Sequence, residues 1–473
     1  MYPPLQYRWF VFAGLLLALL FLPSGALAAE AATLTCAGVS QISAAECAAL
    51  ETLYTSTAGA QWKEKTGWTA TTTPCSWYGV TCQAGHVTGL DLSDNNLVGT
   101  LPPQLGDLTQ LQTLNLARNT LSGAIPATLG ALIHLQTLDL SENQLSGALP
   151  AQIGALTALQ TLNLSNNAFT GTLPAELTAL PQLRTLDLST NQLGGTLPAT
   201  LGNMSALQVL ALNHNQFSGA LPAQLGNLTG LQRLILADNA LSGTIPSQLG
   251  NLNQLTYLVL TGNDLSGSIP PALGNLSQLT VLMLNRNRLT GTIPTQLGNL
   301  TNLFEVWLDS NALTGAVPTS LCDLTSLFFL DTGFNALSSA PACMDFLDPQ
   351  WDQTQTVAPT GLTATPASAS VTLTWSPIVY QSDAGGYEIG FRPAGGVWVV
   401  AGQTADKAAS SFELTGLASN AAYEVRVRSL TAAHLEPPAY QKNAVWSEYV
   451  ASSVRTLPGS APRRLFLPIA SHH

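Results

Sequence analysis

Charged residues are scarce in this sequence of 473 residues. Asp, Glu, Lys and Arg together make up 9% of the positions, against roughly 25% in a typical soluble domain. The formal net charge is -11, and no cluster or stripe of basic residues is present, which argues against a nucleic-acid-binding surface. Solubility must therefore depend on the many Asn, Gln, Thr and Ser side chains.

Motifs of catalysis and of metal or cofactor binding are missing as well. The six histidines do not recur with carboxylates or cysteines at metal-ligand spacing. No GxSxG elbow, HExxH helix or phosphate-binding loop occurs. The sequence therefore predicts a non-enzymatic protein with no cofactor and no metal site.

Long apolar runs are absent after the first 29 residues. Arg8, the fourteen mostly apolar residues 9–22 and the small-residue site at 26–28 follow the order of a secretory signal peptide, residues 1–29. Such a run is short for a bilayer span, which needs about 20 residues. We therefore expect a secreted or extracellular protein with no transmembrane span in the mature chain, and association with a cell surface stays open.

Cysteine is absent from the middle of the chain. The six cysteines lie near the two ends of a long cysteine-free region and are Cys36, Cys47, Cys75, Cys82, Cys322 and Cys343. Their positions favour the disulfides Cys36–Cys47, Cys75–Cys82 and Cys322–Cys343, each closing a short loop in an exported protein. Metal binding is the competing interpretation, and the lack of a CxxC motif argues against it.

What the sequence has in abundance is a repeat of 24 residues. One copy, LQTLNLARNTLSGAIPATLGAL at residues 111–132, contains an asparagine that recurs every 24 residues without insertion or deletion. The eleven asparagines are Asn95, Asn119, Asn143, Asn167, Asn191, Asn215, Asn239, Asn263, Asn287, Asn311 and Asn335. Such a fixed period predicts a solenoid, here over residues 87–343.

The positions within one copy have distinct expected roles. Leu114 and Leu116 alternate as in a short strand whose leucines point into the core. The amide of Asn119 is expected to bond backbone groups of its own turn and of neighbouring turns. Gly123 permits a tight backbone path, and Pro126 favours an extended stretch. Strands of successive turns are then expected to stack into a parallel sheet.

A segment of different pattern precedes the repeats. Residues 30–86 combine a predicted helix at 44–54 with Trp62, Trp68 and Trp77. Because the first turn of a solenoid exposes an apolar cross-section, we interpret this segment as an N-terminal cap.

The pattern changes again after the last repeat. A polar linker is predicted at residues 344–357, followed by period-two alternation over 358–457 that is typical of a β-sandwich. The tail, residues 458–473, contains RRLFLPIASHH, which is too short to cross a membrane. An extra edge strand and a sorting signal are both open for this tail.

The repeats resemble a known family. The pattern LxxLxLxxNxLxGxIPxxLGNLxxL is similar to plant-type (extracellular) leucine-rich repeats, and PCSWYGVTC at residues 74–82 is similar to their N-terminal cap. The resemblance implies an α/β solenoid, a right-handed horseshoe with a concave parallel sheet and short helices on its convex side. It also implies recognition of proteins or peptides, although this sequence lacks the kinase domain and transmembrane helix of plant receptors.

The second domain resembles another family. Its APTGLTAT start, its VTLTW strand and the stretch GLASNAAYEVRVRSL are similar to a fibronectin type III domain. Leu417 and Tyr423 occupy the positions at which that family places its tyrosine corner. The resemblance implies a C-terminal all-β sandwich.

Two columns of the predicted concave sheet change character at the same turn. Between the two strand leucines, successive turns carry Asp91, Asn115, Asp139, Asn163, Asp187, Ala211, Ile235, Val259, Met283 and Trp307. One position before the first leucine they carry Thr113, Thr137, Thr161, Thr185, Val209, Arg233, Tyr257, Val281, Glu305 and Phe329. Because the flanking leucines face inward, both columns are expected to face solvent. The aspartates recur about 10 Å apart, which suits a solvated ladder better than a glycosidase pair.

The apolar part of these columns is the predicted binding surface, because contiguous exposed apolar side chains commonly mark interaction sites. We predict that a protein or peptide binds there through Arg233, Ile235, Tyr257, Val259, Val281, Met283, Arg286, Glu305, Trp307 and Phe329. One alternative is that Trp307 and Phe329 pack against the cap or the sandwich. Another is a cell-surface adhesive or structural protein that binds polysaccharide through the polar half and the sandwich.

Overall fold

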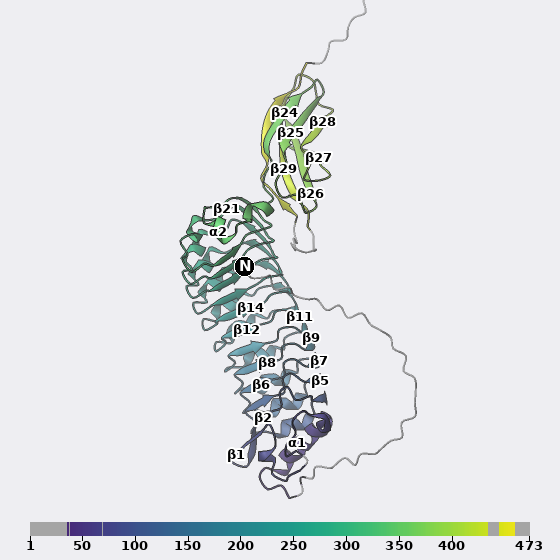
Figure 1. Ribbon diagram of the computed structural model, residues 1–473, viewed down its shortest axis with the longest axis vertical. Coiled ribbons are helices and arrows are strands. Elements are labelled where there is room, and N and C mark those ends of the chain that lie inside the picture. The colour runs from purple at the N-terminus through teal and green to yellow at the C-terminus, as the bar shows by residue number, and fades with distance from the viewer. Residues whose placement is uncertain (1–35, 37, 69, 434–443, 459–473) are drawn as a thin grey trace, which may run out of the picture.

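The computed structural model describes residues 36, 38–68, 70–433 and 444–458. They form a curved solenoid of stacked turns followed by a β-sandwich (Figure 1). The predicted signal peptide at 1–29 and the tail motif RRLFLPIASHH lie outside the described residues. No helix among the described ranges is long and apolar enough to cross a membrane.

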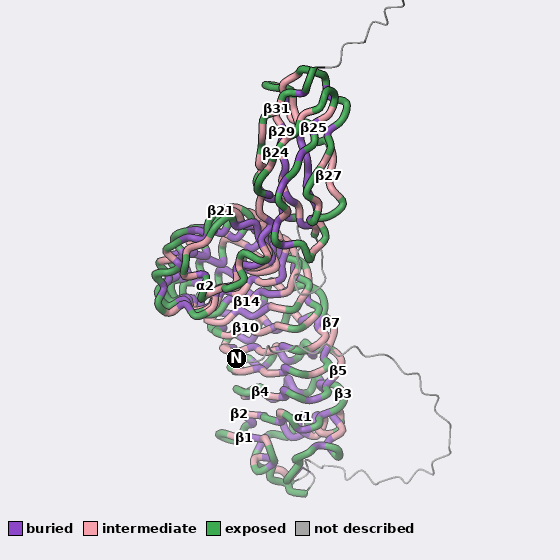
Figure 2. The backbone as a smooth tube through the Cα atoms, turned by 45° about the horizontal axis from the view of Figure 1, so that its top comes forward, coloured by how far each residue is buried: buried purple, intermediate pink, exposed green. Residues whose placement is uncertain are grey.

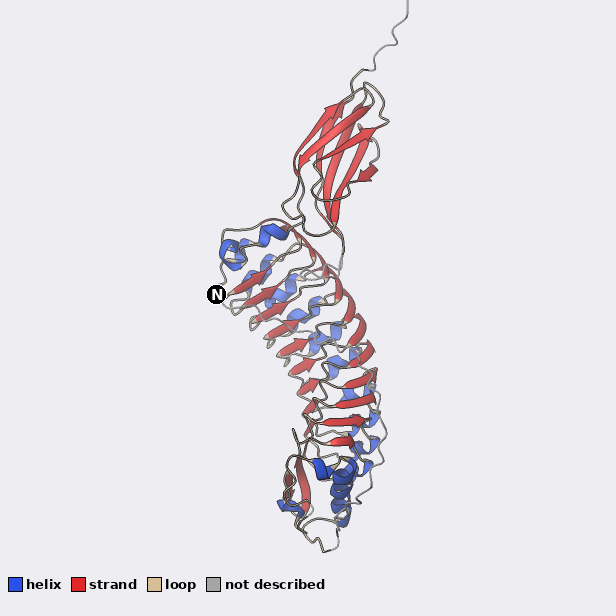
Figure 3. Cartoon of the chain, turned by 45° about the vertical axis from the view of Figure 1, so that its right-hand side comes forward, coloured by secondary structure: helices blue, strands red, loops and turns tan. Residues whose placement is uncertain are grey.

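One long sheet runs along the inner side of the curve (Figure 3) and is called the concave sheet below. Its strands are β1 (Val80–Gln83), β2 (His86–Asp91), β4 (Thr113–Asn115), β6 (Thr137–Asp139), β8 (Thr161–Asn163), β10 (Thr185–Asp187), β12 (Val209–Ala211), β14 (Arg233–Ile235), β16 (Tyr257–Val259), β18 (Val281–Met283), β20 (Glu305–Trp307) and β22 (Phe329–Asp331). β1 and β2 are antiparallel, and the pairs from β2 onward are parallel. The register is one repeat, so Leu186 lies opposite Leu210. The predicted parallel sheet is confirmed.

A second parallel sheet, which the sequence did not predict, forms another side of the solenoid. Its strands are β3 (Val98–Thr100), β5 (Thr120–Gly123), β7 (Gln144–Ala148), β9 (Ala168–Gly171), β11 (Gln192–Thr196), β13 (Gln216–Ala220), β15 (Ala240–Thr244), β17 (Asp264–Ser268), β19 (Arg288–Gly291), β21 (Ala312–Ala316) and β23 (Ala336–Ser339). Each strand begins shortly after the recurring asparagine of its own turn. The short glycine-containing strands gain their pairing only when neighbouring turns stack.

The short helices implied by the family resemblance are 3-10 helices. They are η3 (Pro103–Asp107), η4 (Ala127–Ala131), η5 (Ala151–Ala155), η6 (Ala175–Ala179), η7 (Ala199–Asn203), η8 (Ala223–Asn227), η9 (Ser247–Asn251), η10 (Pro271–Asn275), η11 (Thr295–Asn299) and η12 (Thr319–Leu321). They stack closely: a Cβ added to Gly226 would lie 2.3 Å from the carbonyl oxygen of Gln248 in the next turn. The repeated glycine therefore sets the spacing of this side.

The leucines of all turns join into one continuous core. Figure 2 shows that buried residues recur from turn to turn along the solenoid. The asparagine ladder has its predicted role. Asn239 donates from Nδ2 to the carbonyl oxygens of Leu212, Leu236 and Ala237 at 3.0, 3.2 and 3.2 Å. Its Oδ1 accepts from the Phe217 amide of the preceding turn at 2.9 Å. Each asparagine thus bonds its own turn to the one before it.

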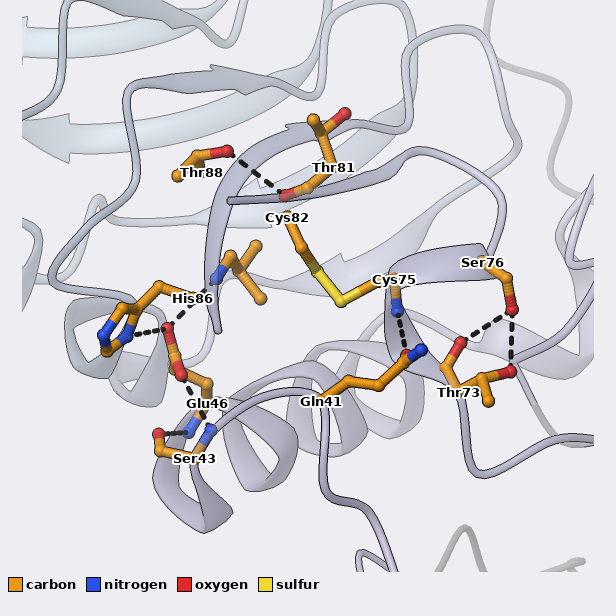
Figure 4. The surroundings of a disulfide bond; sticks show 11 residues. Gln41, Ser43, Glu46, Thr73, Cys75, Ser76, Thr81, Cys82, His86 and Thr88 are labelled. Atoms are coloured by element: carbon orange, nitrogen blue, oxygen red, sulfur yellow. Dashed lines mark hydrogen bonds and ion pairs between the residues drawn. A yellow bond between two sulfur atoms is a disulfide. The ribbon is translucent and has the colours of Figure 1, made fainter. Parts of the chain in front are cut away.

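The N-terminal cap begins with helix α1 (Ala44–Ser56), which starts with a capping box of Ser43 and Glu46. The buried Glu46 also accepts from the Val87 amide at 3.1 Å, which fixes the helix to β2. Figure 4 shows this contact beside the Cys75–Cys82 disulfide. The short 3-10 helices η1 (Gly59–Gln61) and η2 (Pro74–Ser76) complete the cap.

The tryptophans of the cap are buried, as expected for a cover on an apolar solenoid end. Trp62, Trp68 and Trp77 form a cluster in which neighbouring rings lie 4.9 and 5.0 Å apart. The disulfides Cys36–Cys47 and Cys322–Cys343 join the other cysteines, which is the pairing predicted from position.

The stretch predicted as a polar linker packs against the last turn. It contains α2 (Met344–Leu347) and η13 (Trp351–Thr354). Gln355 is buried; its Oε1 accepts from the Leu337 amide at 3.0 Å, and its Nε2 donates to the Thr332 carbonyl at 3.0 Å. Gln355 therefore continues the ladder in place of a further asparagine.

The C-terminal domain is a two-sheet sandwich. One sheet contains β24 (Thr360–Pro366), β25 (Ser370–Ser376) and β28 (Ser411–Thr415); the other contains β26 (Gly385–Pro393), β27 (Val399–Gln403), β29 (Ala422–Thr431), β30 (Val445–Trp446) and β31 (Val450–Arg455). The Tyr423 hydroxyl accepts from the Ala418 amide at 3.0 Å, which is the expected tyrosine-corner bond. The side chains of Trp375 and Tyr387 belong to its core.

Candidate binding surface on the concave sheet

In each of the first five solenoid turns, the residue between the two strand leucines accepts a hydrogen bond from the loop that follows its strand. We call this bond a cap. Asp139 is typical: its Oδ1 accepts from the Ser141 amide at 3.0 Å and from the Ser141 hydroxyl at 2.6 Å. The same bond to the amide two residues later is made by Asp91, Asn115, Asn163 and Asp187. These side chains therefore stabilise their own turns.

Aspartate and asparagine alternate along this capped part of the column. Asn163 donates from Nδ2 to Oδ2 of Asp139 at 3.2 Å, so an amide lies between neighbouring carboxylates. The expectation of a solvated acidic ladder is wrong in part, because most of these groups are half-buried and bonded within the protein. Separation by an amide also keeps like charges from adjoining positions.

Five consecutive turns lack this cap. Their column residues, from Ala211 to Trp307, have no side-chain oxygen that could accept a hydrogen bond from the loop after the strand. Capping returns in the next turn, where Asp331 Oδ1 accepts from the Gly333 amide at 3.0 Å. The uncapped turns are therefore a bounded interval within an otherwise regular array. We call them the uncapped turns and the first five the capped turns.

A cavity of about 640 Å³ lies on the uncapped turns. Residues of four adjacent strands and their flanking loops line it: Arg233, Ile235, Tyr257, Val259, Thr280, Val281, Met283, Asn302, Phe304, Glu305 and Ser326. The structure thus brings together seven of the ten residues predicted for the binding surface. Trp307 and Phe329 lie in the adjoining strands β20 and β22, and their rings are 4.4 Å apart.

Not every predicted position faces solvent. Ala211 and Val281 are buried, with exposed fractions of 5% and 8%. Val281 lies between Tyr257 and Glu305 in the sheet, and these longer side chains flank its isopropyl group. Its expected exposure was wrong because the neighbouring turns supply larger residues.

Arg286 lies beside the two columns, at the edge of the predicted surface. It is not on a strand but in the turn after β18, with a φ of 56°. Its Nη1 lies 4.0 Å from Oδ1 of Asp238, which is the equivalent turn position two repeats earlier. Arg286 is therefore at the loop edge of the sheet, outside the cavity.

Two aromatic residues of the surface were missed. Phe304 and Phe328 are 46% and 66% exposed, and their rings stack 5.4 Å apart. They belong to a third column, which reads Gln112, Gln136, Gln160, Arg184, Gln208, Gln232, Thr256, Thr280, Phe304 and Phe328. The change from glutamine to phenylalanine was the available signal.

The β-sandwich makes its aromatic contact with the array elsewhere. The ring of Phe334 meets that of Tyr380 edge-on at 5.7 Å. Trp307 and Phe329 instead pack on each other. The aromatic contact between the sandwich and the array therefore does not support the alternative that the sandwich covers these two rings.

Two carboxyl groups lie where capping returns. Burial raises the pKa of Asp309 to about 7, and the charge of Asp331 adds to the rise. Burial also raises the pKa of Asp331, although the hydrogen bond from Gly333 opposes that shift. Among the described residues, no group of three or more His, Cys, Asp or Glu side chains is placed to hold a metal ion.

Comparisons with known families agree with this architecture. Models described as leucine-rich repeat region and leucine-rich repeat match residues 126–242, and residues 85–145, 254–276 and 277–337, respectively. A model described as fibronectin type III domain matches residues 357–442.

Individual relatives are plant proteins. The chain is 55% identical over 42 residues to leucine-rich repeat protein 2 of Arabidopsis thaliana, which is 9% of this chain and 19% of that protein. It is 36% identical to the ectodomain of the Arabidopsis receptor kinase HAESA, which was solved with an N-terminally extended IDA peptide hormone ligand. The match covers 62% of this chain and 50% of that one, with a TM-score of 0.56. A plant ice-binding protein is 29% identical, with 64% of this chain and 99% of that one covered and a TM-score of 0.53. The chain thus spans about a fifth of the first relative and half of the receptor ectodomain.

Proposed function

We propose that this chain, which joins plant-type leucine-rich repeats to a fibronectin type III domain, is an extracellular recognition protein without enzymatic activity. Its ligand is a peptide or an extended protein segment, bound on the uncapped turns. The structure of the HAESA ectodomain, which holds a peptide hormone, supports a peptide as the class of ligand. Three disulfides support an oxidising, extracellular location.

The interval of uncapped turns carries this proposal. Each capped turn gains hydrogen bonds from its Asp or Asn, worth about 1 kcal/mol apiece. Five turns replace that group by Ala, Ile, Val, Met and Trp, and the cap returns immediately afterwards. The scaffold loses a hydrogen bond in each such replacement, whereas a ligand gains apolar contact area.

Selection from a library of displayed linear peptides against the purified chain tests the proposal. Peptides that bind are expected to lose at least about tenfold in affinity to Tyr257→Ala/Trp307→Ala, because aromatic anchors dominate such interfaces. The matched control is Thr137→Ala/Thr161→Ala in the capped turns. Equal loss in both variants, or affinity retained in the aromatic double variant, would move the site away from the uncapped turns.

A second candidate function is ice binding, favoured by one specific observation. At or just after the end of several strands of the second sheet, the same position of the repeat carries an exposed hydroxyl side chain, as in Thr172, Thr196, Thr244 and Thr292. Adjacent turns repeat this position about 4.8 Å apart, and every second turn about 10 Å apart. The similar plant ice-binding protein is covered over nearly its full length. Inhibition of ice recrystallisation that is lost in Thr196→Tyr/Thr244→Tyr would support this function; no inhibition by the wild type would eliminate it.

The polysaccharide alternative receives less support from the capped turns. There one oxygen of each Asp or Asn in the column accepts a hydrogen bond from its own turn, which leaves fewer groups for a sugar. No contact in the described part of the chain favours that alternative over a peptide ligand.

A further inference from the structure

The cavity on the uncapped turns carries a charge at each end. Of the described residues that line it, Arg233 and Glu305 alone are charged at neutral pH. They occupy the same column of the concave sheet, with Tyr257 and Val281 between them. The two charges therefore lie on one line that crosses the strands, three strand spacings apart.

Neither charge is neutralised within the described chain. The other cations on this part of the array have carboxylate partners, as in the Arg288–Asp264 pair at 3.1 Å and the Arg286–Asp238 pair at 4.0 Å. No ion pair among the described residues involves Arg233 or Glu305. A charged group at either end of a ligand would therefore find an unoccupied partner.

The orientation of Arg233 is limited by its neighbour. Its guanidinium carbon lies 4.6 Å from the centroid of the Tyr257 ring, a cation–π distance. A guanidinium that stacks on a ring keeps its N–H groups free at its edge for a carboxylate. Arg233 is thus held ready to receive an acidic side chain.

Three polar side chains of the cavity already donate to backbone carbonyls. The hydroxyl of Thr280 donates to the Thr256 carbonyl at 3.0 Å, and that of Ser326 donates to the Thr301 carbonyl at 2.6 Å. The Asn302 amide donates to the Ser277 carbonyl at 2.8 Å. Because these groups are bonded to the backbone, the two charges, the Tyr257 hydroxyl and the apolar floor remain to select a ligand.

The floor between the charges is apolar. Ile235, Val259 and Met283 lie in the next column, and the ring of Phe304 forms one edge of the cavity. An apolar side chain placed midway between the charges would bury its surface there, at about 25 cal/mol per Å² of apolar area.

We propose that the cavity selects an extended peptide with an acidic and a basic side chain four residues apart and an apolar side chain midway between them. This inference rests on the proposed function, since it specifies the ligand of the same surface. The acidic side chain binds Arg233, the apolar one lies over Tyr257 and Val281, and the basic one binds Glu305.

The spacing supports this pattern. Strands of a sheet lie about 4.8 Å apart, so the three steps from β14 to β20 cover about 14 Å. An extended peptide rises about 3.3 Å per residue, so residues i and i+4 are about 13 Å apart and, with i+2, face the same side. A peptide that crosses the strands therefore matches both charges at once.

Synthetic nonapeptides test the pattern on the full chain by fluorescence anisotropy. The reference peptide has Glu, Leu and Lys at i, i+2 and i+4, and a second peptide has the reverse order. Two mismatched peptides carry Glu or Lys at both ends. The wild type is expected to bind the better of the two mixed-charge peptides about fivefold more tightly than either like-charged peptide, with a smaller difference at high salt.

Charge reversal in the protein makes the test specific. Arg233→Glu is expected to prefer the peptide with two lysines, and Glu305→Arg the peptide with two glutamates. Arg184→Glu is the control, because it changes the net charge equally at an exposed position of the capped turns.

The outcomes separate this inference from the function on which it rests. Binding of all four peptides with equal affinity, lost in Tyr257→Ala/Trp307→Ala, would overturn the charge pattern and leave peptide recognition intact. Failure of every peptide, together with failure of the displayed library, would overturn both. A preference that changes equally in Arg184→Glu would overturn the assignment to Arg233.

Discussion

The capped and uncapped turns of the concave sheet share one scaffold. Both have the same leucine register, as in the pair Leu186 and Leu210, and the same asparagine ladder, as in Asn191 and Asn239. They differ in the outward column, which bonds the following turn in one half and is apolar in the other. The comparison separates the residues that build the solenoid from those that are free to contact a partner.

A single position can thus serve stability or recognition, but the two uses exclude each other. An Asp at this position directs its carboxylate back to its own backbone. A Val or Met there makes no such bond. It leaves apolar surface whose burial by a partner is favourable in free energy. The bounds of the uncapped turns, at Ala211 and Trp307, accordingly mark the extent of the proposed interface.

The largest expected effect tests whether the scaffold is common to both halves. Leu210→Asp places an unpaired charge in the core and should lower the free energy of unfolding by at least about 4 kcal/mol. Leu186→Asp, in a capped turn, should lower it by a similar amount, because both leucines are fully buried. Thermal and urea denaturation measure both. An unchanged melt in either variant would contradict the assignment of these leucines to the core.

The next effect tests the boundary at which capping returns. In the capped turns asparagines separate the carboxylates, whereas the charges of Asp309 and Asp331 act on each other directly. The pKa of Asp309 is raised to about 7, so the folded state holds a proton that the unfolded chain releases near pH 4. Stability should therefore fall as the pH rises from about 4 to about 7.

Asp309→Asn should remove that dependence. At pH 8 the free energy of unfolding of the variant should exceed that of the wild type by up to about 4 kcal/mol, and the gain should vanish near pH 4. Melting temperatures across this range measure it. Parallel pH profiles for the two proteins would contradict the shifted pKa.

A smaller effect tests the cap itself. Asp187→Ala removes the acceptor for the Ser189 amide and hydroxyl, and it should destabilise the protein by about 1 kcal/mol. Asp187→Asn keeps an acceptor oxygen at the same place and should cost less than half of that. Chemical denaturation of the pair measures the difference; equal losses would show that charge, and not the hydrogen bond, matters there.

The smallest effect is expected for a substitution that extends the polar part of the column by one turn. Because Asp and Asn alternate up to Asp187, Asn is the residue that would continue the column in place of Ala211. Ala211→Asn should change stability by less than about 1 kcal/mol, since the buried site gains a hydrogen bond and loses apolar contact. Peptide affinity should stay within about twofold, because Ala211 does not line the cavity. A large loss of affinity would show that the interface extends beyond the cavity to this first uncapped turn.

Much of this architecture was predictable because it repeats. The recurring asparagines and leucines predicted the concave sheet and the ladder, and the cysteines at the ends predicted the disulfides. The second sheet was not predictable in the same way. A strand such as Gln216–Ala220 has no apolar alternation of its own and pairs only because the ladder aligns neighbouring turns.

The site was less predictable than the fold because it depends on neighbouring turns. Val281 is buried by residues 24 positions away on either side, and residues of four neighbouring strands line the cavity. Phe304 and Phe328 were overlooked because their column is otherwise polar. For Val281 and for the cavity, the deciding contacts lie between turns and not within one.

Gln355 gives the join between the two domains a property of its own. By continuing the ladder, it attaches the sandwich to the last turn through the same backbone groups that an added repeat would use. An array with one whole repeat more or fewer can therefore end on the same contacts, whereas any other change of length would leave Gln355 out of step. The reach between the cap and the sandwich is thus adjustable only in units of one strand spacing, about 4.8 Å. The number of repeats therefore sets the distance between the two end domains in fixed steps, while the outward columns determine what can bind along that length.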